Sequence, residues 1–230
     1  MKTRYTVLCW LALSLVASAQ SSLSPSTSLP WLIFDAKAGV GGMIPPDFSR
    51  WSETVRLIRS PDVRTSLDAG MSALFRLADP FYGGVDVTYV FFEDAADATS
   101  AVQQLRLTGT MLIPSVCLSI VPLAPLQSRA LVKLTVGTGL LLGTINNTLS
   151  QPSLYRTTGL ALFSEFTFGL PLSASVLATF NASLRGGLTG VAQNGSERLE
   201  YLNSDREKKP VTLSFFAFSL RFGIALKLPS

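Results

Sequence analysis

The segment FAFSLRFGIALKL, residues 216–228, determines how the rest of the chain is interpreted. Every second residue from Phe216 to Leu228 is large and apolar, while the residues between them are small or charged, among them Arg221 and Lys227. Successive side chains of a β-strand point to opposite faces of its sheet. The alternation therefore predicts a strand with one apolar and one polar face.

The same alternation recurs in seven earlier segments, so the chain is predicted to be all-β. Pro114 falls inside one of these segments and has no amide hydrogen to donate, so a bulge or local break is expected near it. The predicted strands cover residues 32–44, 64–77, 82–92, 110–122, 129–145, 158–170, 174–187 and 216–228.

The connections between these segments alternate in length. Short connections are predicted at 78–81, 123–128 and 171–173. Such alternation is typical of an up-and-down barrel with one decorated rim, and an even strand count puts both termini on the side of the short turns. The long connections are polar and cover 45–63, 93–109, 146–157 and 188–210.

The polar face of the strands carries nearly all of their charge. If the apolar faces pointed inward, their bulky side chains would overfill a small barrel, whereas a Lys or Arg that faces lipid near mid-bilayer costs about 2 to 4 kcal/mol. We therefore predict an eight-stranded antiparallel up-and-down transmembrane β-barrel with an interior charge network. Its predicted members are Asp35, Lys37, Asp68, Arg76, Asp86, Lys133, Glu165, Arg185 and Arg221.

Within this network, counting along the strands predicts that Lys133 lies near Glu165 and Asp35 near Arg221. The set holds four acids and five bases, so one base must find water, a carbonyl group or an ion. A narrow, anion-leaning pore is therefore one alternative. A soluble secreted barrel that binds an apolar ligand is a second, since periodicity alone does not fix which face points outward.

The first residues have the pattern of a secretory signal: Lys2 and Arg4, then an apolar run, then small residues that end at Ala19. We expect a signal peptide over residues 1–19 that is cleaved after Ala19, a linker over 20–30 and the barrel over 31–230. Removing the signal leaves 17 basic and 15 acidic residues, a balance that does not suggest a nucleic-acid partner.

Composition restricts the possible chemistry. The chain contains no histidine, which is the commonest general base and a frequent metal ligand, and after the signal only Cys117 remains of two cysteines. We therefore expect no enzymatic activity, no metal site and no cofactor.

The signal, the alternation in 216–228 and the long-short connections make residues 31–228 resemble the small outer-membrane barrels of the OmpA-like and OmpX-like type. The resemblance implies a Gram-negative outer membrane and, as partners, its lipid and lipopolysaccharide together with the barrel assembly machinery. Such barrels often end on an aromatic residue, whereas this chain ends in Leu228-Pro229-Ser230. This departure weakens the implied recognition by the assembly machinery.

A binding function is expected in the long connections. A short amphipathic helix is predicted in the first, where Arg50, Trp51, Arg56 and Arg59 would touch lipopolysaccharide phosphates; a solvated loop is the alternative. The fourth connection is charged and predicts a solvated hairpin. The expected function is structural, adhesive or protective, exerted through extracellular loops whose partner the sequence does not identify.

Overall fold

The computed structural model describes residues 29–56, 63–95, 106–121, 130–147, 153–203 and 205–228. The predicted signal peptide lies outside these residues. The elements are β1 (Leu32–Ile44), α2 (Pro46–Arg56), β2 (Arg64–Ala78), β3 (Phe81–Ala95), β4 (Arg106–Ile120), β5 (Leu131–Asn147), β6 (Ser153–Pro171), β7 (Val176–Thr189), β8 (Gln193–Asn194), β9 (Glu197–Arg198), β10 (Glu200–Leu202), β11 (Lys208–Pro210) and β12 (Phe215–Leu228).

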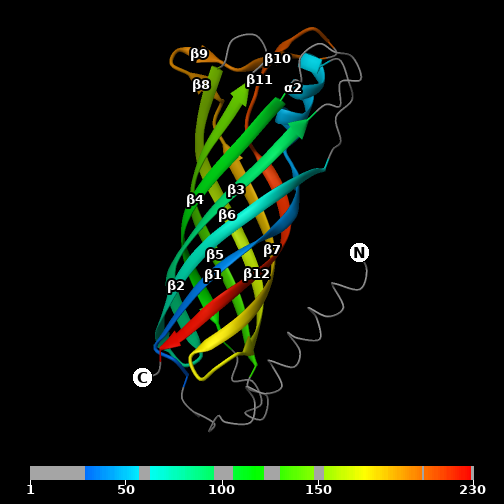
Figure 1. Ribbon diagram of the computed structural model, residues 1–230. Helices are drawn as coiled ribbons and strands as arrows, with labels where there is room; N and C mark the ends of the chain where they lie inside the picture. Colours follow the sequence, from blue (N-terminus) through cyan, green and yellow to red (C-terminus); the bar gives the residue numbers. More distant parts are fainter. Residues whose placement is uncertain are drawn as a thin grey trace, which may run out of the picture.

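Eight long strands form a closed ring. Each pairs antiparallel with its neighbours in the order β1, β2, β3, β4, β5, β6, β7, β12, and β12 pairs back with β1. Figure 1 shows these strands as a tilted barrel. All eight predicted strands are confirmed, with ends shifted by up to five residues, and their side chains alternate between the inside and the outside as the sequence pattern requires. The predicted long connection at 146–157 was wrong, because β5 continues to Asn147 and β6 begins at Ser153.

Pro114 interrupts one ladder without shifting it. Between β4 and β5 the pairing stops after Leu112↔Leu142 and resumes at Ser115↔Gly139 in the same register. The break that the missing amide hydrogen predicts is therefore present, and no residue is inserted.

The two ends of the barrel differ. Two-residue and four-residue turns at 79–80 and 172–175 lie at one end, together with the start of β1 and the end of β12. At the opposite end lie α2 and the short strands β8 to β11 (Figure 1). We call these the turn end and the cap end. No described helix is long and apolar enough to cross a membrane.

The outside of the barrel is apolar. Two consecutive residues of β12 show the division most clearly: Arg221 is 0% exposed and Phe222 is 69% exposed. The same holds on β6, where Leu162 is 66% exposed and Glu165 is buried. A water-soluble barrel would need the reverse arrangement, so the soluble alternative does not fit this structure.

The inside is layered. Along β1, Ile33 belongs to an apolar cluster at the turn end, Asp35 and Lys37 follow in a charged layer, and Met43 belongs to a second apolar cluster at the cap end. Tyr82 and Phe163 are among the turn-end cluster. The barrel is thus filled by side chains along its length.

Candidate functional site: the buried charge layer and the cap

Eight charged side chains meet inside the barrel, and each is at most 5% exposed. They come from seven of the eight long strands, so the layer links nearly the whole circumference. These eight are among the nine predicted interior residues. We call them the charge layer: Asp35, Lys37, Asp68, Asp86, Lys133, Glu165, Arg185 and Arg221.

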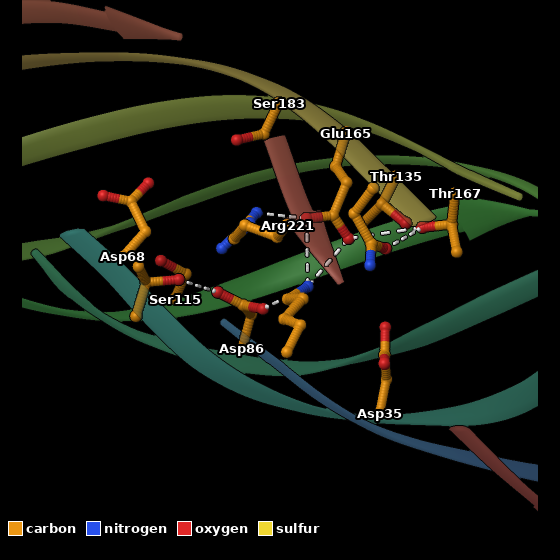
Figure 2. A network of polar contacts seen from close by, with 12 residues as sticks. Asp35, Asp68, Asp86, Ser115, Thr135, Glu165, Thr167, Ser183 and Arg221 are labelled. Atoms are coloured by element: carbon orange, nitrogen blue, oxygen red, sulfur yellow. Dashed lines mark hydrogen bonds and ion pairs between the residues drawn. The ribbon is translucent and has the colours of Figure 1, made fainter. Parts of the chain in front are cut away.

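Glu165 lies at the centre of the charge layer. Its carboxylate accepts hydrogen bonds from Lys37 Nζ at 2.7 and 3.0 Å and another from Arg221 Nη2. Lys37 Nζ also lies 3.2 Å from Asp86 Oδ2. Figure 2 shows Glu165 and Arg221 pointing toward each other, with Asp86 nearby. Two cations therefore share the Glu165 carboxylate, and Lys37 also bridges it to Asp86.

Two longer ion pairs flank this centre. Lys133 Nζ lies 3.6 Å from Asp35 Oδ2, and Arg185 Nη1 lies 4.0 Å from Asp68 Oδ2. Hydroxyl groups connect the pairs to the centre: Arg185 Nη2 donates to Thr88 Oγ1 at 3.2 Å, and Thr88 donates to Asp86 Oδ1 at 2.8 Å. On the other side, Thr179 donates to Asp35 Oδ1 at 3.3 Å, and Asn181 and Thr167 continue this chain of hydrogen-bond contacts to Glu165, so the charge layer is one connected network.

One of the two predicted neighbour pairs within the layer was wrong. Asp35 was expected beside Arg221, but Asp35 pairs in register with Ala225, and Arg221 pairs with Gly39. The first residue of β1, Leu32, pairs with the last of β12, Leu228, so Asp35 and Arg221 stand at different heights on neighbouring strands and cannot meet. Lys133 does lie near Glu165 on the neighbouring strand, directly opposite Thr167 and two residues from Glu165, but its ion pair is with Asp35.

Arg76 is the predicted interior residue that lies elsewhere. It sits at the turn end with its side chain 26% exposed, donates to Leu29 O at 2.8 Å and lies 3.6 Å from Asp79 Oδ1. Without it, the charge layer holds four acids and four bases. The surplus base that suggested an anion-leaning pore is therefore not in this layer.

The contrast between outside and inside has one physical solution. Exposed leucine, valine and phenylalanine around the whole ring need an apolar solvent, and the strands satisfy their ladder hydrogen bonds because the ring has no edge. The chain is a transmembrane β-barrel. Within the described residues, no group of three or more Cys, Asp or Glu side chains is placed to hold a metal ion.

The helix α2 covers the barrel mouth at the cap end. Its residues Phe48 and Trp51 are buried, and the two rings lie 5.6 Å apart. Phe48 also packs edge-on against Phe92 of β3, with ring centroids 5.1 Å apart. The helix therefore turns its apolar face into the barrel and away from the surrounding membrane.

The fourth connection completes this cover. Its apolar residues Leu199, Tyr201, Val211 and Leu213 are buried in the same cluster as Trp51. Backbone hydrogen bonds join Ala192, Leu199 and Val211, and Thr212 Oγ1 donates to Asp47 Oδ2 of α2 at 2.6 Å. We call α2 together with the described residues between β7 and β12, 190–203 and 205–214, the cap.

These contacts correct two predictions. Trp51, expected to touch lipopolysaccharide, is 3% exposed and cannot. The fourth connection, expected to be a solvated hairpin, has charged residues on its surface but an apolar underside.

The other predicted contacts of the first connection remain predictions. Arg50 is exposed, and a hydrogen bond with Tyr201 raises the pKa of its guanidinium. The Arg56 side chain and all of Arg59 lie outside the described residues.

No protein-family model matches the chain, and no curated protein matches it in sequence. Solved structures of similar shape include a major outer membrane protein from Thermus thermophilus, with 16% identity over 86% of this chain and 99% of that chain and a TM-score of 0.47. Neisserial surface protein A is 15% identical over 86% of this chain and 97% of its own chain, with a TM-score of 0.45. The outer membrane protease OmpT from Escherichia coli is 6% identical over 90% of this chain and 99% of its own chain, with a TM-score of 0.43.

Proposed function

We propose that this chain is a non-enzymatic barrel of a Gram-negative outer membrane, that it does not conduct solutes, and that it acts through its cap in a structural, adhesive or protective role. The observation that carries the proposal is the filled interior. A charge layer is held between two apolar clusters, and the cap closes one end. Among the described residues, no part of that arrangement resembles a water-lined path.

The orientation follows from the asymmetry of the ends. Outer-membrane barrels keep short turns on the periplasmic side and longer loops outside. The cap end therefore faces the exterior, where a folded surface built from α2 and β8–β11 is available to partners. Loops on a rigid barrel are a common place for binding functions.

The non-enzymatic part rests on chemistry. The chain has no histidine, and the buried acids Asp86 and Glu165 are each engaged by Lys37. A carboxylate held by cations in a filled interior is not accessible to a substrate. The layer therefore serves to hold the strands together.

A cap-deletion experiment tests this proposal. Cells would express the full chain or a variant in which residues 193–210 are replaced by a short Gly-Ser linker. Both proteins are expected to fractionate with the outer membrane and to show a heat-modifiable band, while attachment of the cells to surfaces, or their resistance to lysis, falls only in the variant. A full chain found in the soluble fraction, or a variant that behaves like the full chain in both assays, would contradict the proposal.

A narrow pore is the second candidate, and one observation favours it. Several buried polar atoms of the described interior have no hydrogen-bond partner, among them Ser66 Oγ, Ser72 Oγ and Arg221 Nε. Buried groups of this kind usually bind water. A water path would still have to pass both apolar clusters.

A further inference from the structure

Three residues of neighbouring strands form a row at the cap end. Arg156 of β6 pairs directly with Gln193 of β8, and Gln193 pairs directly with Arg198 of β9. Residues directly opposite each other in antiparallel strands point to the same face of the sheet. The three side chains therefore form one row, which we call the arginine row.

The arginine row faces outward, toward the surroundings of the barrel. On β6 the outward residues alternate with buried ones, and Leu160 and Leu162 of the same series are 63% and 66% exposed. Arg156 belongs to this series and is itself exposed, as are Gln193 and Arg198. The row thus continues the lipid-facing surface toward the cap end.

The height of the row matches the edge of the membrane. About ten residues of tilted strand cross an apolar band about 25 Å tall. On β6, the outward residues from Leu170 to Leu160 are apolar except for Ser164, and they cover about the length of this band. The next outward residues toward the cap end are polar, Thr158 and then Arg156. Figure 1 shows the β8–β9 hairpin projecting sideways from the barrel at the cap end.

The two guanidinium groups are free to bind. Among the described residues, neither Arg156 nor Arg198 has an ion pair or a side-chain hydrogen bond, whereas Lys208 and Lys209 of the same connection pair with Glu200 and Glu207. The acid next in sequence, Glu197, turns to the other face, where it accepts a hydrogen bond from Tyr155 at 3.4 Å. The row is therefore locally cationic.

We propose that the arginine row binds phosphate groups of lipopolysaccharide in the leaflet at the cap end. The inference rests on the proposed outer-membrane location and names a partner for it. A guanidinium group can donate two parallel hydrogen bonds to a phosphate. The backbones of Arg156 and Arg198 are two strand spacings apart, about 10 Å, so each reaches a separate phosphate of one headgroup, with the Gln193 amide between them.

A binding measurement tests the inference. The full-length protein would be reconstituted in phosphatidylcholine vesicles and titrated with fluorescently labelled lipopolysaccharide. The variant R156Q/R198Q is compared with K208Q/K209Q, which loses the same two positive charges from paired positions. We expect at least a tenfold weaker affinity for R156Q/R198Q, less than a twofold change for K208Q/K209Q, and a similar weakening for wild type when the lipopolysaccharide is dephosphorylated.

Three outcomes would overturn the inference: equal losses in both variants, which indicate non-specific charge attraction; no loss in R156Q/R198Q; or displacement of the labelled lipid by millimolar inorganic phosphate, which indicates a site for the free ion. Heat-modifiability of each variant shows whether it is folded. If the wild-type protein does not fractionate with the outer membrane, the proposed function fails. If it does and R156Q/R198Q binds like wild type, only the arginine row fails.

Discussion

The charge layer and the cap place charge in opposite ways. In the charge layer, Glu165 is buried and the adjacent strands show leucine and phenylalanine to the outside. In the cap, Glu200 and Lys208 lie on the surface, and Leu199 and Tyr201 are buried beneath them. The barrel wall therefore exposes apolar side chains, whereas the cap exposes charged ones. The boundary between these two surfaces marks the edge of the membrane.

Neutralising one carboxylate in each region is expected to give the largest difference in the free energy of unfolding. Glu165→Gln leaves Lys37 and Arg221 without their shared counter-charge, so it should lower the free energy of unfolding by about 3 to 5 kcal/mol. Glu200→Gln, which removes an exposed pair with Lys208, should cost about 0 to 1 kcal/mol. Urea unfolding in detergent micelles measures both, and equal losses would show that the charge layer does not stabilise the barrel.

A cation placed on an exposed leucine should distinguish lipid from water. Leu162 and Leu202 are 66% and 53% exposed, but only Leu162 lies on the barrel wall. Leu162→Arg should destabilise the protein by about 2 to 4 kcal/mol in a bilayer, and Leu202→Arg should have little effect. Unfolding from lipid vesicles is the suitable measurement. If Leu162→Arg were as mild as Leu202→Arg, the outward face would not contact hydrocarbon.

Glycine substitutions test how tightly the interior is filled. Gly109 lies directly opposite Phe92, whose ring occupies the space that a Cβ atom would need, whereas a Cβ at Gly186 would approach only Phe215 O at 3.9 Å. Gly109→Val should cost about 1 to 3 kcal/mol through overpacking. Gly186→Val should be tolerated. A stable Gly109→Val protein would mean that the cap-end cluster has room to spare.

The smallest expected effect concerns an exposed pair of the cap. Lys209 lies 2.9 Å from Glu207, and its hydrogen bond lowers the pKa of that carboxyl. The pair therefore exists above the ordinary pKa of the carboxyl and is lost as the pH falls through the lowered value. Lys209→Gln should raise the pKa of Glu207, as followed by NMR, and leave global unfolding unchanged. An unaltered pKa would show that the two side chains do not interact in solution.

The barrel strands could be predicted from the sequence because the pattern of period two is local. Each strand of the ring buries one face and exposes the other, so Phe216, Phe218 and Leu220 reveal their orientation without knowledge of their neighbours. The interior position of Glu165 and Arg221 follows from the same alternation.

Contacts across the interior could not be predicted in this way. They join strands that are not adjacent in the ring: Arg221 of β12 reaches past β7 to Glu165 of β6, which the pattern along a single strand cannot show. The orientation of α2 was missed for a different reason. Phe48 and Trp51 stand three residues apart, the spacing of one helical face, and this signal identifies the buried side more reliably than the arginines identify the exposed one.

The buried residues of the cap also follow a recognisable pattern in the sequence. Leu199 and Tyr201 before the charged run, and Val211 and Leu213 after it, alternate with polar residues as buried strand residues do. The alternation is short, and the many charges between the two pairs suggested a fully solvated segment.

Single-channel recording in planar bilayers tests the central claim, a closed barrel, most directly. The wild-type protein, inserted in the heat-modifiable form, should give no unitary conductance steps in molar salt, because two apolar clusters and a neutralised charge layer fill its interior. Regular steps of constant size, absent from a mock-purified sample, would contradict a closed barrel and favour the pore.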